Sequence, residues 1–257
     1  MAVTIKTDKE IAILREGGKR LAYILNELAK MVKPGISTLD IDNLARKLVK
    51  EGGDEASFLN YKPHGAGRAY PAAVCVSIND EIVHGIPNEN PKILKDGDIV
   101  SLDMGLIHGG LFTDSAVTVG VGEIDQAGKD LIETTRQSLF EGIKAVKDGK
   151  YVRDISYAIE KYVRPKRLGI VEELCGHGVG YKVHEDPYIP NYCLDGKGEK
   201  LRVGMVIAIE PMLNEGSKKI VLDKDEWTYR TADGKRSAHF EHTIVVTKNG
   251  AEILTML

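Results

Sequence analysis

The sequence contains few cysteines and aromatic residues and has no long apolar run. Its three cysteines, Cys75, Cys175 and Cys193, are an odd number without Cys-x-x-Cys spacing. This pattern argues against a disulfide framework and against a thiolate zinc site, and it fits a reducing compartment. The longest apolar stretches, such as residues 205–209, are far too short to span a bilayer. We therefore expect no membrane span and no disulfide-stapled fold.

An excess of positive charge is also missing. The formal net charge is -3, so the composition predicts neither a nucleic-acid footprint nor a polybasic membrane patch. The first residues lack the apolar core of a signal peptide. Hydrophobic residues make up 42% and charged residues 28%, an ordinary globular balance. We expect a cytoplasmic protein with no specific nucleic-acid partner. Residues 1–257 are expected to form a single domain, because no linker or low-complexity tract divides them.

Periodic patterns divide the chain into helical and extended segments. Apolar residues recur at helical spacing in residues 9–32, and Ser37 or Thr38 can cap a second helix. Residues 60–72 are rich in Gly, Pro and Tyr, as is typical of a loop. The remaining expected elements are a strand at 73–78, a hairpin at 99–119, helices at 126–147 and 151–163, and mostly strands and turns from 179 onward.

An internal repeat relates the two halves of the chain. Pro34-Gly35 and Asp148-Gly149 each precede an amphipathic helix at the same offset. Residues 97–103 and 204–210 each consist of a glycine, an apolar strand and a terminal acid, followed by a second strand that carries an acid. The repeat predicts one α+β domain with pseudo-twofold symmetry. The acids stand in matching order: Asp103 and Asp114 in the first half, Glu210 and Glu241 in the second.

These acids occupy strand positions where apolar side chains are expected. An isolated buried carboxylate is costly, so it needs a partner charge or a metal. A two-residue turn at His108-Gly109 would place Asp103 directly opposite Asp114, and a turn at Gly109-Gly110 would make them diagonal neighbours on one face. A three-residue turn would place them on opposite faces. Two facing aspartates repel each other unless a cation lies between them.

A histidine among alternating glycines, His177 in Cys175-Gly176-His177-Gly178-Val179-Gly180, joins the four acids as a candidate ligand. Four carboxylates and one imidazole form an oxygen-rich set, which favours Mn²⁺, Fe²⁺, Co²⁺ or Zn²⁺ over copper. Five such side chains exceed the needs of one ion and predict two metals roughly 3.5 Å apart.

The order of these residues resembles the pita-bread metallopeptidases, and the type I methionine aminopeptidases most closely, over nearly the whole chain. The motifs are an Asp followed by another eleven residues on, then Gly-His-Gly-x-Gly, Glu-Pro and Phe-Glu-His-Thr. His84, in the segment 79–87, and His184, seven residues after His177, match two substrate-binding histidines of the family. The resemblance implies the pita-bread fold: a pseudo-twofold antiparallel sheet core with helices packed on its outer face.

The resemblance also implies an activity and a set of roles. The expected activity is removal of the N-terminal initiator methionine from nascent proteins by two-metal hydrolysis, with preference for a small second residue. A monomeric enzyme is implied, and ribosome association is left open. The expected metal ligands are Asp103, Asp114, His177, Glu210 and Glu241; the catalytic residues are His84, His184 and Glu210; the substrate contacts are His84, His184, Phe58, Tyr61, Cys75 and Trp227. The expected cofactors are two divalent ions, Co²⁺, Mn²⁺, Fe²⁺ or Zn²⁺.

One loop departs from the family pattern, and other functions stay open. Many type I enzymes have a Tyr-His pair leading into a Cys-bearing strand, whereas Tyr61 is followed by the longer loop 62–71, with His64 as one alternative histidine. An Xaa-Pro aminopeptidase or prolidase-like peptidase shares the ligand pattern. A catalytically silent pita-bread binding protein is a further alternative, although such proteins usually lack several ligands. A purely structural metal site is a third alternative, but such sites favour Cys and His ligands, whereas four of the five candidate ligands here are acids.

Overall fold

The computed structural model describes residues 3–257. Four α-helices and a short 3₁₀ helix alternate with mostly short strands. The helices are α1 (Asp8–Met31), α2 (Thr38–Gly52), α3 (Gln126–Ala145), α4 (Val152–Val163) and η1 (Arg164–Lys166). The strands are β1 (Glu55–Ala56), β2 (Cys75–Ile78), β3 (Glu81–Val83), β4 (Ile99–His108), β5 (Leu111–Gly120), β6 (Gly169–Ile170), β7 (Gly176–Gly178), β8 (Glu185–Ile189), β9 (Val206–Ile209), β10 (Met212–Asn214), β11 (Ile220–Leu222), β12 (Tyr229–Thr231), β13 (Ser237–His239), β14 (Glu241–Thr247) and β15 (Gly250–Ile253).

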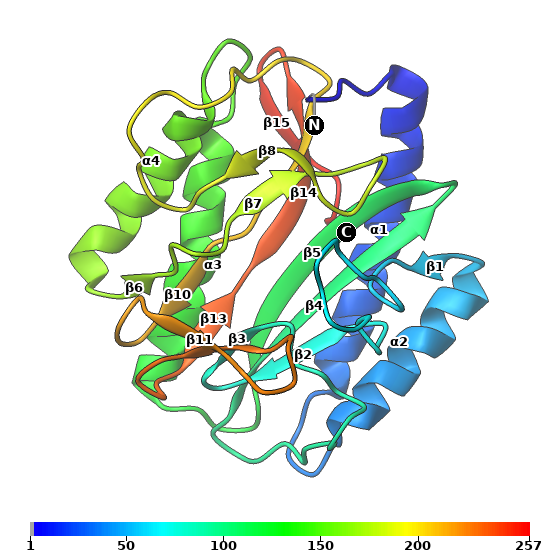
Figure 1. Ribbon diagram of the computed structural model, residues 1–257, viewed down its shortest axis with the longest axis vertical. Coiled ribbons are helices and arrows are strands. Elements are labelled where there is room, and N and C mark those ends of the chain that lie inside the picture. The colour runs from blue at the N-terminus through cyan, green and yellow to red at the C-terminus, as the bar shows by residue number, and fades with distance from the viewer. Residues whose placement is uncertain (1–2) are drawn as a thin grey trace.

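A nine-stranded antiparallel sheet forms the centre of the molecule. Its strands follow the order β1-β4-β5-β14-β9-β7-β8, with β2 added beside β4 and β15 beside β14. Two three-stranded sheets, β13-β10-β6 and β11-β12-β3, extend it. The helices lie in two pairs, α1 with α2 and α3 with α4, which flank the strands on opposite sides in the view of Figure 1. Strands from the two halves of the chain therefore meet where β5 pairs with β14.

The internal repeat is visible in the backbone. Ser37 precedes α2 and forms an isolated bridge with Ile93, and Tyr151 precedes α4 and forms one with Lys200. In both halves the bridge partner lies six residues before a central strand, β4 or β9. The carboxylates at the third helical positions, Asp40 and Asp154, accept the backbone N–H of Ser37 and of Tyr151. This shared carboxylate cap at the third helical position explains why the same sequence pattern begins both helices.

Each half of the chain packs its own apolar core between a helix pair and the sheet. In the first half, Leu21, Leu25 and Leu28 of α1 pack with Leu102 of β4. In the second half, residues of α3 and α4 pack against β9 and β14. Full burial of one such side chain contributes roughly 1.5–3 kcal/mol. Among residues 3–257, no helix has both the length and the apolar character that a membrane span requires.

Candidate metal and active site

The first two acids come from the hairpin of β4 and β5. Its turn is Gly109-Gly110, and both residues have positive φ, +56° and +79°, which glycine adopts without strain. Asp103 lies opposite Ala116. Asp114 lies opposite Gly105. The two aspartates are therefore diagonal neighbours on one face, which is the second of the registers considered from the sequence.

The other three candidate ligands come from neighbouring strands. Glu241 opens β14 and lies opposite Ala116 of β5. His177 is in β7 and lies opposite Ala208 of β9. Glu210 follows directly after β9. Because β4, β5, β14, β9 and β7 are consecutive in the sheet, all five side chains come from one stretch of it.

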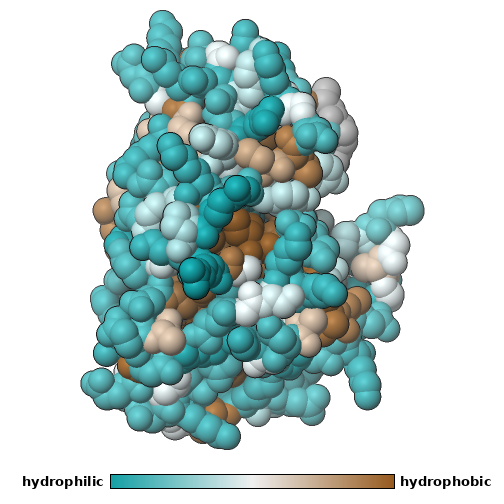
Figure 2. Space-filling view, turned by 90° about the vertical axis from the view of Figure 1, so that its left-hand side faces the viewer, coloured by the Kyte–Doolittle hydropathy of each residue, from teal (hydrophilic) through white to brown (hydrophobic). Residues whose placement is uncertain are grey.

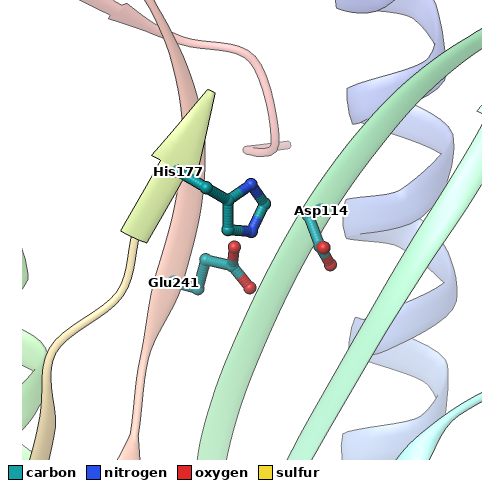
Figure 3. A group of neighbouring side chains, drawn as sticks. All are labelled: Asp114, His177 and Glu241. Carbon is teal, nitrogen blue, oxygen red and sulfur yellow. The ribbon is translucent and has the colours of Figure 1, made fainter. Parts of the chain in front are cut away.

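Three of these side chains form a tight group. The ligand atoms of Asp114, His177 and Glu241 all lie within 4.8 Å of one another, and the three side chains point toward a common space (Figure 3). Nε2 of His177 is also 3.4 Å from Oε1 of Glu210. Asp103 lines the same space from β4.

This space is a cavity of about 150 Å³. Its walls combine the acids and histidines with aromatic and apolar side chains. All eleven residues expected from the sequence as ligands, catalytic residues or substrate contacts line it, together with Pro63 and Tyr70. They are Phe58, Tyr61, Cys75, His84, Asp103, Asp114, His177, His184, Glu210, Trp227 and Glu241, of which five are the candidate ligands.

The carboxylates are in an environment that disfavours their charged form. Burial raises the pKa of Asp103 to about 7. Burial, and then repulsion from Asp103 and Glu210, raises the pKa of Asp114 well above its usual range. The pKa of Glu241 is raised by burial and by repulsion from Asp114. Oδ1 of Asp103 and Oε1 of Glu241 are buried without a hydrogen-bond partner in the described chain. Orphaned carboxylate oxygens of this kind fit divalent cations.

His177 presents one ring nitrogen to this group. Its Nδ1 lies 2.9 Å from the carbonyl oxygen of Gly178, and because a carbonyl only accepts, Nδ1 carries the proton. Burial lowers the pKa of His177 to about 3, which keeps the imidazole neutral. Nε2 therefore carries the lone pair and faces Glu210, the arrangement of a metal-ligating histidine.

Two further histidines face the cavity from other elements. His184 packs edge-on against His177, with ring centroids 4.5 Å apart, and its Nδ1 lies 2.9 Å from the hydroxyl of Tyr61. His84 has a φ of +59°, an unusual conformation for a residue with a side chain, and its ring lies 6.0 Å from that of Trp227. Burial lowers the pKa of His84 to about 4. Packing therefore holds the rings of His84 and His184 beside the four candidate carboxylate ligands.

The remaining wall of the cavity is apolar. Cys75 packs with Tyr70, Phe58 and Trp227 in a small cluster of its own. The rings of Tyr70 and Trp227 meet edge to face at 5.3 Å. The arrangement places an apolar pocket beside a polar, carboxylate-lined floor.

Comparisons with known proteins identify the family to which this chain belongs. A model of metallopeptidase family M24 matches residues 12–248. The chain belongs to metallopeptidase family M24. It is similar to methionine aminopeptidase 1 of Bacillus subtilis, with 45% identity over 98% of this chain and 99% of that protein. The resemblance stated from the sequence is thereby confirmed, and membership makes the chain a metallopeptidase that uses divalent metal.

Solved structures confirm the pita-bread fold of this M24 chain. Methionine aminopeptidase from Thermotoga maritima matches with a TM-score of 0.93 and 44% identity, over the whole of both chains. Prolidase from Pyrococcus furiosus matches with a TM-score of 0.79 and 21% identity, over 98% of this chain and 65% of that one. At that identity the second match shows the fold alone.

Sequence reasoning missed two residues at the site of this M24 chain. Tyr70 forms part of the apolar wall, but it fell within a stretch assigned to a loop. His239 is buried, and its Nε2 lies 3.7 Å from Oε2 of Glu210, while neither ring nitrogen has a hydrogen-bond partner in the described chain. A signal for His239 existed, because it stands two residues before Glu241 and strand alternation would place both on one face.

The loop that departs from the family pattern lies at the rim. Pro63 lines the cavity beside Tyr61. His64 is exposed and is not among the lining residues. Further along, Arg68 pairs with Glu89 and so ties the loop to the segment after β3.

Proposed function

We propose that this chain removes the N-terminal methionine from newly made polypeptides and prefers a small second residue. The observation that carries the proposal is the cavity itself, in which a floor of buried acids adjoins an apolar pocket. Relatives at 41–45% identity over nearly their whole length are named methionine aminopeptidases, which supports the same activity here.

Five side chains would hold two divalent ions, Co²⁺, Mn²⁺, Fe²⁺ or Zn²⁺. We assign Asp103, Asp114, His177, Glu210 and Glu241 as the residues that would hold them. The orphaned oxygens of Asp103 and Glu241 and the free Nε2 lone pair of His177 support this set. When bound, such ions lower the pKa of a coordinated water to about 7 and polarise a carbonyl oxygen.

The chain's own groups would then move protons and orient the substrate. Glu210 would accept the proton of the attacking water and return it to the leaving amine, a role suited to a carboxylate whose pKa burial has raised. His184 would donate a hydrogen bond to the oxygen of the scissile carbonyl. His84 would contact the nitrogen of the scissile amide. The acids near Asp103 would attract the free α-amine, which explains action at the chain end.

The apolar wall would select methionine. Phe58, Cys75 and Trp227 form the pocket, and Tyr61 closes it near His184. A flexible, unbranched thioether side chain fits an irregular apolar pocket and makes favourable contacts with aromatic rings. The narrowness of the cavity supports the preference for a small second residue, because a misplacement of about 1 Å at the carbonyl can cost roughly 10²-fold in rate.

A peptide comparison tests the identity of the substrate. Methionine release from Met-Ala-Ser should exceed the release of the first residue from Leu-Ala-Ser and from Ala-Pro-Ser. Faster cleavage of Ala-Pro-Ser would support the Xaa-Pro peptidase alternative. No cleavage of any peptide by metal-loaded protein would support a silent binding protein.

The cellular setting forms a second part of the proposal: residues 1–257 act as one catalytic domain, as a monomer, in the cytoplasm and at the ribosome. An open groove of about 1130 Å³, formed by α3, α4 and the start of β15, supports the ribosome contact. Its lining carries five lysines against two acids: Lys144, Lys147, Lys150, Lys161 and Lys166 against Glu141 and Asp154. Figure 2 looks at the side that carries α4, where hydrophilic residues surround a hollow with an apolar floor.

Phosphates of ribosomal RNA would bind these lysines without base specificity. Co-sedimentation with ribosomes should weaken in the Lys147→Glu/Lys161→Glu variant and with rising salt. Lys33→Glu serves as the control, because Lys33 is exposed in the segment after α1. Equal co-sedimentation of the two variants would contradict the proposal that this groove contacts the ribosome. Light scattering of the purified protein tests the monomeric state.

A further inference from the structure

The extended segment before α1 runs beside the turn that carries His184. The backbone N–H of Lys6 donates to the carbonyl of Gly204 at 2.8 Å. From there the side chain of Lys6 turns inward, and only 1% of it is exposed. Thr7 then begins α1 as its N-cap. A charged residue close to the start of the chain is thus buried against residues 180–185, near the cavity.

The partner of Lys6 is Glu185, whose two carboxylate oxygens serve different parts of the chain. Oε2 accepts hydrogen bonds from Nζ of Lys6 at 2.7 Å and from the hydroxyl of Thr4 at 2.6 Å. Oε1 accepts the backbone N–H groups of Tyr181 and of Lys182, the latter at 3.0 Å. The carboxylate therefore joins the N-terminal segment to the turn between β7 and β8.

The stem of Lys6 also fits the shape of this turn. A Cβ added at Gly180, where φ is +138°, would lie 2.3 Å from Cε of Lys6. The backbone of the turn therefore packs directly against the Lys6 side chain, with no space for a larger residue at position 180. Nζ of Lys6 lies 4.8 Å from the centre of the Tyr181 ring. Removing the stem would leave this part of the turn without its packing partner.

His184 is the last residue of the same turn and directly precedes Glu185. Its ring is held on the cavity side by His177 and by the hydroxyl of Tyr61. The backbone that carries it is held on the other side by Glu185. Glu185 is not among the residues that line the cavity, so the backbone next to His184 is held by contacts outside it.

We propose that Lys6 and Glu185 form a positioning pair, which fixes the β7–β8 turn so that His184 points at the scissile carbonyl. This inference rests on the catalytic role proposed above for His184. Lys6 is thus a positioning residue for the reaction, contributed by the segment that precedes the first helix. Loss of the pair should lower turnover because a misplacement of about 1 Å can cost roughly 10²-fold in rate.

A double-mutant cycle with His184 tests the proposal on the metal-loaded protein. Lys6→Met keeps the length of the stem but removes its charge, and Glu185→Gln keeps the carbonyl acceptor but removes the carboxylate. Each is expected to lower kcat for Met-Ala-Ser by about 10- to 100-fold, with KM and metal content near the wild-type values. In a His184→Ala background, either change should have little further effect on kcat. Arg15→Met, which breaks the half-exposed pair of Arg15 with Glu252, is the control and should leave kcat unchanged.

The outcomes separate this proposal from the proposed function. If Lys6→Met lowers kcat equally with and without His184, the pair does not act through that residue and the proposal is wrong. An unchanged kcat in both single variants would also overturn it, while leaving the activity and the role of His184 intact. If His184→Ala alone leaves kcat unchanged, the catalytic role of His184 fails, and this inference fails with it. If Lys6→Met does not fold, Glu185→Gln decides by the same criteria.

Discussion

Replacing Asp103 by Asn should change stability in opposite directions with and without metal. The Asp103 carboxyl is buried, and its Oδ1 has no hydrogen-bond partner in the described chain. Burial raises its pKa from 3.8 to about 7. Between these values the native carboxyl keeps a proton that the unfolded chain has released. The metal-free protein therefore loses stability as pH rises through this range, and the loss is complete above about pH 7.

The size of the effect follows from the same values. The pKa of Asp103 rises from 3.8 to about 7, and each pH unit corresponds to about 1.4 kcal/mol. The metal-free protein therefore loses about 4 kcal/mol of its free energy of unfolding over this range. Asn cannot ionise, so the variant lacks this loss. In the presence of chelator, the stability of Asp103→Asn relative to wild type should grow by roughly 3 kcal/mol between pH 5 and pH 8. With saturating Mn²⁺ the order should reverse, because metal stabilises the wild type more strongly.

Urea unfolding at the two pH values, with chelator or with Mn²⁺, measures these differences. Asp42→Asn is a matched control, because Asp42 is equally buried but paired with Arg46 and with the N–H of Ala73. The control should be destabilised whether or not metal is present. The reasoning is refuted if Asp103→Asn is less stable than wild type at pH 8 in chelator.

Three other predictions follow from the site. His84→Ala and His184→Ala should each lower kcat by about 10²–10³ and leave metal content unchanged; loss of metal would make the replaced residue a ligand. Metal binding at pH 7 should release protons, because Asp103, Asp114 and Glu241 have raised pKa values. Calorimetry in buffers of different ionisation enthalpy detects this release, and equal apparent enthalpies would contradict it. For Met-Xaa-Ser peptides, kcat/KM should fall as Xaa grows from Gly to Leu, and equal values would remove the narrow-cavity argument.

The predictions that succeeded from sequence rested on local patterns. The helix expected at 9–32 is Asp8–Met31, because apolar spacing and the Thr7 cap both lie within one segment. The repeat of two helices and two acid-bearing strands is seen in both halves, and the same carboxylate cap begins α2 and α4. The acids were recognised as a group because each one interrupts an apolar strand.

The hairpin register could not be chosen from sequence alone. His108-Gly109 and Gly109-Gly110 can each form a two-residue turn, and moving the turn by one residue shifts the partner of Asp103 by two positions, from Asp114 to Ala116. The observed turn uses both glycines at positive φ, which His108 would adopt only with strain. This choice makes Asp103 and Asp114 diagonal neighbours instead of direct partners.

Long-range contacts made by polar residues were beyond the sequence analysis. No sequence pattern distinguishes Lys6, and only the fold brings it to Glu185, 179 positions away. Tyr70 reads as part of a loop, yet it is buried and packs on Trp227. Neither case has a periodic or motif signal, because the partner lies in another element.

The central claim is that the buried acids and His177 hold divalent metal that the peptidase reaction requires. Titrating Mn²⁺ or Co²⁺ into chelator-treated protein, while following methionine release from Met-Ala-Ser, tests it most directly. We expect no release in chelator and activity that rises with bound metal, and we expect the same titration to leave Asp114→Asn inactive. Methionine release at the wild-type rate in excess chelator, or from metal-titrated Asp114→Asn, would contradict the account.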